Sequence, residues 1–207
     1  MDQFIHKITH QLTLDLPGDA AFEKMSIPNR SDWKPNEKTR KSAVLILFYK
    51  GNGEIYIPLI LRPKYDGVHA GQMAFPGGRF ENFDENLHRT ALREAQEEIG
   101  IKATDVKIMG QLTEIFIAPS NFYAQPVVGF IPYKPDFYPD PREVDTVFEV
   151  NIKEFLDPKN ISKTTIKVKE LSFEVPCYVI NGNIIWGATA LMISELTAII
   201  GNSGVFE

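Results

Sequence analysis

The stretch from Gly77 to Ile101 reads GGRFENFDENLHRTALREAQEEIGI, and its second half carries a dense cluster of acidic residues. On a helix that turns by about 100° per residue, Glu94, Glu97 and Glu98 fall within about 100° of one another. Neighbouring carboxylates repel, at a cost of roughly a few tenths of a kcal/mol per pair. A helix that only had to be stable would avoid this arrangement, whereas a hard divalent cation such as Mg²⁺ requires oxygen ligands. The pattern therefore predicts a helix that presents a metal-binding carboxylate cluster.

The residues on either side of this cluster predict where the helix begins and ends. Phe75-Pro76-Gly77-Gly78 precedes it as a tight backbone passage that a ligand can approach closely. Asn82 together with Glu85, or Asp84 alone, is expected to cap the first turn, and Gly100 is expected in the left-handed conformation that ends a helix. The alternative, an acidic face that contacts only solvent, leaves the coincidence of turn, caps and facing carboxylates unexplained. The expected packing residues are Leu87, Ala91, Leu92, Ala95 and Ile99.

This stretch resembles the Nudix box, written G-x5-E-x7-R-E-U-x-E-E-x-G-U with U an aliphatic residue. The matching positions are Arg93, Glu94, Glu97, Glu98, Gly100 and Ile101. Two positions depart from the motif: Glu85 has the expected spacing to Arg93 but lies one residue too far from Gly78, and Ala95 is smaller than the usual aliphatic residue. The resemblance implies an α/β fold, the Nudix-like α/β/α sandwich with a mixed β-sheet.

The segment before the box narrows the range of expected substrates. Leu59 to Gly78 is similar to the motif at this place in coenzyme A pyrophosphatases of the Nudix superfamily. The matching residues are Arg62, His69, Gly71, Gln72, Phe75, Pro76, Gly77 and Gly78. Asp66 and Gly67 stand where that motif has Leu-Arg, which implies a weaker dependence on the 3′-phosphate of coenzyme A. The resemblance implies cleavage of coenzyme A or its thioesters to 3′,5′-ADP and (acyl-)4′-phosphopantetheine.

The same resemblance implies the chemistry. Mg²⁺ or Mn²⁺ bound by Glu94, Glu97 and Glu98 would bridge phosphate oxygens, offset the developing charge and lower the pKa of a bound water. Glu98 is the first choice for the base and Glu143 the second, because Nudix enzymes often recruit a base from a loop outside the box. The alternative for Glu143 is a solvated turn residue. Arg93, one turn before Glu97, is expected to orient it. The expected substrate-binding residues are Arg62, His69, Gly77, Gly78 and Arg79.

Composition agrees with a single folded unit outside a membrane. With 207 residues, 43% of them hydrophobic, the chain can bury one core, so residues 1–207 are expected to form one Nudix domain with 1–40 as an N-terminal extension. The net charge of −5 offers no broad basic surface for nucleic acid. The sequence contains no apolar run of about 18 residues, the length that would predict a membrane span. Because Met1 to His10 is too polar for a signal peptide, we expect a cytoplasmic protein.

The remaining pattern predicts strands interleaved with helices, which favours a layered α/β fold. Pro58 indicates an edge or a bulge in its strand, and Asn181-Gly182-Asn183 indicates a hairpin. Cys177, the single cysteine, is expected to be a buried packing residue and excludes a disulfide framework. The expected helices, besides the acidic one, are 2–12 and 186–200, and the expected strands are 43–49, 55–62, 106–117, 125–132, 144–150, 164–169 and 173–180.

Two classes of function remain open at this stage. The first is a metal-dependent pyrophosphohydrolase, with coenzyme A and its thioesters as the leading small-molecule substrates and ADP-ribose or another nucleoside diphosphate derivative as the alternative. The second is a non-catalytic Nudix module that senses a nucleotide. Loss of glutamates from the box would favour the sensor, and all three facing glutamates are present. A role of residues 1–40 in forming a homodimer is also left open.

Overall fold

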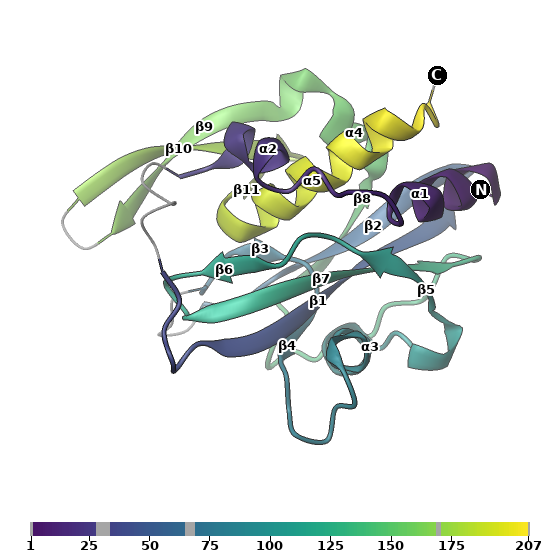
Figure 1. Ribbon diagram of the computed structural model, residues 1–207, viewed down its shortest axis with the longest axis horizontal. Coiled ribbons are helices and arrows are strands. Elements are labelled where there is room, and N and C mark those ends of the chain that lie inside the picture. The colour runs from purple at the N-terminus through teal and green to yellow at the C-terminus, as the bar shows by residue number, and fades with distance from the viewer. Residues whose placement is uncertain (1, 28–33, 65–68, 169–170, 207) are drawn as a thin grey trace.

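A computed structural model describes residues 2–27, 34–64, 69–168 and 171–206 (Figure 1). At its centre is a mixed sheet with the strand order β3-β2-β1-β7-β5, to which β4, β6 and β8 add by pairing with β1, β7 and β2. β1 and β7 are parallel, and the other pairs are antiparallel. The strands are β1 (Arg40–Gly51), β2 (Glu54–Leu61), β3 (Met73–Ala74), β4 (Gly77–Arg79), β5 (Lys107–Gln111), β6 (Ile115–Ile117), β7 (Phe122–Ile131) and β8 (Thr146–Asn151).

Helices cover both faces of this sheet, so the expected α/β/α sandwich is confirmed (Figure 1). A helix of the acidic stretch lies on one face, and the N-terminal and C-terminal helices lie on the other. The helices are α1 (Asp2–Gln11), α2 (Asp19–Phe22), η1 (Glu23–Met25), α3 (Leu87–Ile99), η3 (Ala103–Asp105), α4 (Ile152–Leu156), η4 (Pro158–Asn160) and α5 (Gly187–Ser203). A second, antiparallel sheet of β9 (Ile161–Val168), β10 (Leu171–Ile180) and β11 (Asn183–Ile185) packs against α5.

The apolar run of β1 explains why helices pack on both faces of the central sheet. Leu45 and Leu47 point to the side of α3, whereas Ile46 and Phe48 point to the side of α5, and all four are fully buried. Successive side chains of a strand alternate between faces, so a continuous apolar strand requires cover on both. The α3 contacts come from the small face formed by Ala91, Ala95 and Ile99.

A buried carboxylate ties the N-terminal segment to α5. Glu195 is fully buried, and its Oε1 accepts hydrogen bonds from the backbone N–H of Gly18 at 2.9 Å and from the Thr113 hydroxyl at 2.5 Å. The backbone N–H of Thr113 donates to Oε2 at 3.0 Å. Lys7 donates to the carbonyl of Gly204 at 2.9 Å. The segment before β1 is therefore tied to α5 at Gly18, and α1 is tied to the residue that follows α5.

Several local predictions are confirmed. The N-terminal helix is α1, and the hairpin turns at Asn181 and Gly182, whose φ angles are 51° and 79°. Cys177 is fully buried in β10, where burial raises the pKa of its thiol. No helix among the described residues is long and apolar enough to cross a membrane.

Two strand predictions need correction. The expected strand 106–117 is two strands, β5 and β6. The N–H of Leu112 still donates to Pro126 of β7, but the chain leaves β7 at Thr113, whose N–H donates to Glu195 of α5. β2 is an interior strand, with β8 along one side. Pro58 lies where the partner on the other side changes from β1, at Glu54–Tyr56, to β3, at Ile60 and Leu61. Proline is tolerated at this position, as it is at the edge of a sheet, because no neighbouring strand needs a hydrogen bond from its nitrogen.

Candidate active site

The caps of α3 fix where its carboxylates point. Asn86 is the N-cap, and its side chain accepts from the backbone N–H of Arg89 at 3.0 Å. The prediction of a cap from Asn82 with Glu85, or from Asp84, is therefore wrong. The predicted C-terminal residue is confirmed: Gly100 has a φ of 75°, and a Cβ there would lie 2.9 Å from Cβ of Tyr138.

Asp84 is not available as a cap because it binds Arg93. Its two oxygens accept from Nε and Nη2 of Arg93 at 3.0 Å each, and Oδ2 also accepts from Thr90 at 2.9 Å and from the backbone N–H of Glu81 at 3.0 Å. The hydrogen bonds from Arg93 lower the pKa of Asp84 to about 2. Glu85, which has the motif spacing to Arg93, is exposed and lies 3.5 Å from Arg89. Counting forward from Gly78 would have identified Asp84 as the acidic partner.

Arg93 forms hydrogen bonds with the box loop, with β4 and with two glutamates of α3. Besides Asp84, its Nη1 donates to Glu94 at 2.7 Å and to Glu97 at 3.0 Å, and its Nη2 donates to the carbonyl of Arg79 at 2.9 Å. The hydrogen bond to Asp84 first, and that to Glu94 next, raise the pKa of its guanidinium although burial opposes the shift. The box loop, β4 and α3 are thus joined through one side chain, in agreement with the expected contact between Arg93 and Glu97.

Three carboxylates meet beside β4: Glu94, Glu98 and Glu143 can each place an oxygen within 4.8 Å of the other two. Glu98 is 1% exposed, accepts from the backbone N–H of Gly77 at 2.7 Å and lies 3.5 Å from Arg62. Burial raises the pKa of Glu98 to about 7, although Arg62 opposes the shift, and burial also raises the pKa of Glu94. Three acids this close together, with Glu94 and Glu98 buried and Glu143 exposed, favour a compensating cation.

The helix and one distant loop share this cluster. Glu97, the third glutamate predicted to face the cavity, is turned toward Arg93 with 56% of its side chain exposed, and it lies outside the group. Its place is taken by Glu143, which is exposed on a turn that starts at Asp140. The N–H of Asp140 donates to the carbonyl of Glu98 at 3.0 Å, so the turn is anchored on the end of α3.

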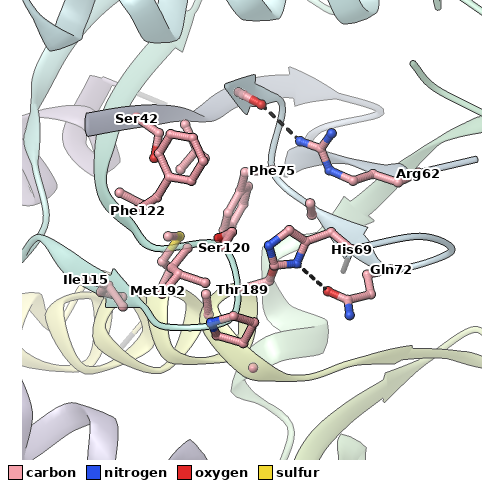
Figure 2. A pocket seen from close by; sticks show the side chains of 18 of the residues that line it. Ser42, Arg62, His69, Gln72, Phe75, Ile115, Ser120, Phe122, Thr189 and Met192 are labelled. Atoms are coloured by element: carbon pink, nitrogen blue, oxygen red, sulfur yellow. Dashed lines mark hydrogen bonds between the residues drawn. The ribbon is translucent and has the colours of Figure 1, made fainter. Parts of the chain in front are cut away.

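The predicted substrate-binding residues all line one cavity of about 950 Å³ that also contains the carboxylate cluster. Figure 2 shows Arg62 and His69 in this cavity. Arg62 donates to the carbonyl of Gly77 at 3.0 Å, and Nδ1 of His69 lies 3.1 Å from Oε1 of Gln72. Arg79 is half exposed. The predicted set lining the cavity is Arg62, His69, Gly77, Gly78 and Arg79. Asp66 and Gly67 lie outside the described residues.

The glycines of β4 are required by close approach. A Cβ on Gly77 would lie 2.4 Å from the carbonyl oxygen of Ala43 in β1, and a Cβ on Gly78 would lie 2.5 Å from Oε2 of Glu94. The first contact is with rigid backbone and the second with the end of a flexible side chain. Gly77 therefore permits the pairing of β4 with β1, and Gly78 leaves room for a carboxylate.

Sequence reasoning missed one wall of the cavity. It is formed by α5 and the residue before it, among them Trp186, Thr189 and Met192, which face the sheet across the cavity (Figure 2 labels the last two). The apolar pattern of 186–200 predicts a buried helix but does not say what it is buried against. Ile185 to Ala190 also resembles coenzyme A pyrophosphatases, but that resemblance assigns these residues no place in a cavity.

The NUDIX domain family matches residues 39–171, and the chain belongs to it. Among relatives, the Nudix hydrolase NudL of Yersinia pestis is 34% identical over 152 residues, which cover 69% of this chain and 76% of NudL. NudL of Yersinia pseudotuberculosis matches to the same extent. Among solved structures, the Nudix hydrolase RenU of M. smegmatis superposes with a TM-score of 0.56 at 16% identity, over 79% of this chain and 87% of RenU, and shares the fold.

The family and the site together define a hydrolase that acts on pyrophosphate bonds. Nudix hydrolases generally use divalent metals such as Mg²⁺ or Mn²⁺, and the donors present here fit such an ion. Carboxylate oxygens are the ligands that hard cations prefer, and three carboxylates converge beside Gly78, which leaves room for the carboxylate of Glu94.

Proposed function

We propose that this protein is a metal-dependent pyrophosphohydrolase of coenzyme A and its thioesters, with 3′,5′-ADP and (acyl-)4′-phosphopantetheine as products. One observation carries the proposal. The cavity that holds the carboxylate cluster is also lined by Arg62, His69 and Gln72, which belong to the segment that resembles coenzyme A pyrophosphatases. A pyrophosphate beside the carboxylates would thus lie in the same cavity as the residues on which the substrate assignment rests.

Glu94, Glu98 and Glu143 are the proposed ligands of Mg²⁺ or Mn²⁺, together with Glu97 once its exposed side chain turns from Arg93. When bound, the metal supplies charge that offsets the charge developing on the phosphate oxygens. Glu143 is better placed than Glu98 to take the proton of the attacking water, because it is exposed in the cavity. Glu98 is buried, and its Oε2 already accepts from Gly77.

Arginines and an aromatic ring supply the proposed contacts to the rest of the substrate. Arg62 uses one nitrogen for the carbonyl of Gly77, which leaves further N–H groups of its planar fork for phosphate oxygens. Phe122 lines the cavity, and the guanidinium of Arg40 lies 4.1 Å from its ring centroid. A ring held in this way offers a surface on which adenine can stack.

The substrate assignment predicts which products form. With Mg²⁺ or Mn²⁺, coenzyme A should give 3′,5′-ADP and 4′-phosphopantetheine, and an acyl-coenzyme A should give acyl-phosphopantetheine with its thioester intact. In water labelled with heavy oxygen, the label should enter a phosphate group. The measurement is mass spectrometry of the products from a panel of coenzyme A, acyl-coenzyme A, ADP-ribose, NADH, diadenosine polyphosphates and deoxynucleoside triphosphates. If ADP-ribose is turned over much faster than coenzyme A, the coenzyme A assignment is wrong, but the assignment to the Nudix hydrolases still holds.

Asp84 offers a test of how Arg93 is positioned. Asp84→Asn removes the charge that binds Nε and Nη2 of the guanidinium, so the position of Nη1, which donates to Glu94, should be less well fixed. Loss of a residue that orients metal ligands typically costs ~10–100-fold in metal affinity or activity, and we expect a fall in this range together with a higher metal requirement. The control is Glu85→Gln, one position further along the chain. Its activity and metal requirement should stay within about twofold of wild type, because Glu85 is exposed and its ion pair with Arg89 lies at the surface. Equal losses in the two variants would contradict the assignment of this role to Asp84.

A further inference from the structure

The cavity is lined by two unlike groups of residues. Glu94 and Glu98 come from α3, on one side of the central sheet, whereas the apolar residues that we call the apolar recess gather on the other side, next to α5. The residues of the apolar recess are Phe75, Ile115, Trp186, Ala188, Leu191 and Met192. Four of these six lie at positions 186–192, beyond the residues matched by the NUDIX family, which end at 171. The carboxylates thus belong to the family match, and most of the recess does not.

The size of the cavity leaves room for more than a diphosphate. Sites for small molecules typically have volumes of ~300–1,000 Å³, and this one, at about 950 Å³, lies near the upper limit. Because the carboxylates and the apolar recess belong to one continuous cavity, a substrate whose pyrophosphate lies beside the carboxylates has room for one of its arms in the recess. The identity of that arm is therefore decided by the chemistry of the recess.

The recess suits a hydrocarbon chain better than a sugar. Thr189, a polar side chain that α5 contributes to the wall, already donates its hydroxyl to the carbonyl of Met73 at 3.0 Å. A ribose hydroxyl placed against Phe75, Leu191 and Met192 would lose its water without gaining a partner from these side chains, which is unfavourable. A chain of methylenes gains free energy from the same burial.

We propose that the apolar recess receives the acyl group of a coenzyme A thioester, so that α5 determines which substrates are preferred. The inference rests on the proposed function and adds to it a selectivity among coenzyme A compounds. It predicts that free coenzyme A is the poorer substrate. The value of kcat/KM should rise with acyl length, by about fourfold for each methylene that becomes buried, until the recess is full.

Two alanines of α5 provide a matched pair for the test. Ala188 and Ala198 are both half-buried on this helix; Ala188 lines the cavity, and Ala198 is not among the cavity-lining residues of the described chain. Ala188→Phe should lower kcat/KM for an octanoyl thioester at least about tenfold and leave free coenzyme A within about threefold, because the new ring fills the recess. Ala198→Phe should leave the ratio of the two substrates unchanged.

Met192→Ala enlarges the apolar recess, whereas Ala188→Phe fills it. It therefore tests the recess independently if Ala188→Phe fails to fold. By enlarging the recess it should move the preferred acyl chain to a greater length, as read from kcat/KM across acetyl, butyryl, octanoyl and palmitoyl thioesters. Wild-type values that are flat across this series, or equal losses of octanoyl and free coenzyme A in Ala188→Phe, would overturn the recess assignment while the proposed function survives. If the wild type cleaves none of the coenzyme A compounds, the proposed function fails with it.

Discussion

Glu98→Gln is expected to lower kcat by at least about a hundredfold. Glutamine keeps the shape of the side chain and can still accept the hydrogen bond from the N–H of Gly77, which is 2.7 Å long in the wild type. What it removes is one of three charges that converge beside β4. Removing a single preorganised group of this kind typically costs ~3 kcal/mol of transition-state stabilisation. The measurement is steady-state turnover of the best substrate at saturating metal, and near wild-type turnover would contradict a metal role for Glu98.

The stability of the same variant supplies its control. Burial raises the pKa of Glu98 from 4.5 to about 7, with Glu94 and Glu143 adding to the shift and Arg62 opposing it. A carboxyl whose pKa is higher in the folded state contributes stability below its unfolded pKa and loses it as the pH rises through the folded value. In metal-free wild-type protein, ionised Glu98 thus costs roughly 3 kcal/mol at a pH of about 8. Thermal melts should show Glu98→Gln to be the more stable protein there, and a lower Tm would mean that the lost turnover reflects misfolding.

Gly78→Ala is expected to lower kcat/KM by about a hundredfold with the fold intact, by displacing a charged group from the site. The new Cβ would meet the carboxylate of Glu94 at 2.5 Å, and this flexible side chain can move aside. Moving it takes a second carboxylate out of the cluster. Gly77→Ala should instead prevent correct folding, because its Cβ would lie 2.5 Å from Cα of Val44.

A glycine with open space around it serves as the control for this series. A Cβ on Gly201, in the last turns of α5, has no neighbour within 4 Å. Gly201→Ala should therefore keep full activity and gain a few tenths to about 1 kcal/mol of stability, since alanine is the better helix former. The measurements are kcat/KM and thermal melts of the three variants. Wild-type activity in Gly78→Ala would exclude Glu94 from the reaction.

Helical periodicity predicted part of the carboxylate site. It placed Glu94, Glu97 and Glu98 on one side of α3, but the angular spread of about 100° leaves the outermost member undecided. Arg93 draws Glu97 to itself, and that competition depends on where Asp84 holds the guanidinium. A helical projection contains no information about such pairing.

The other members of the site come from distant segments, which is why the sequence could not place them. Glu143 was only a second choice for the base, yet it completes the cluster because Asp140 donates its N–H to the end of α3. The fold class was predictable because the apolar run of β1 and the box motif are local signals. The wall formed by α5 depends on long-range packing alone.

The tie between Glu195 and the N-terminal segment has a consequence for the cooperativity of unfolding. If the segment around Gly18 separated from α5, a fully buried carboxylate would lose one of its donors, and uncompensated burial of a charge costs several kcal/mol. We therefore expect the segment around Gly18 to unfold together with the helix that walls the cavity. The rate at which the amide hydrogen of Gly18 exchanges with solvent should consequently report on the opening of α5, from a position outside the carboxylate cluster.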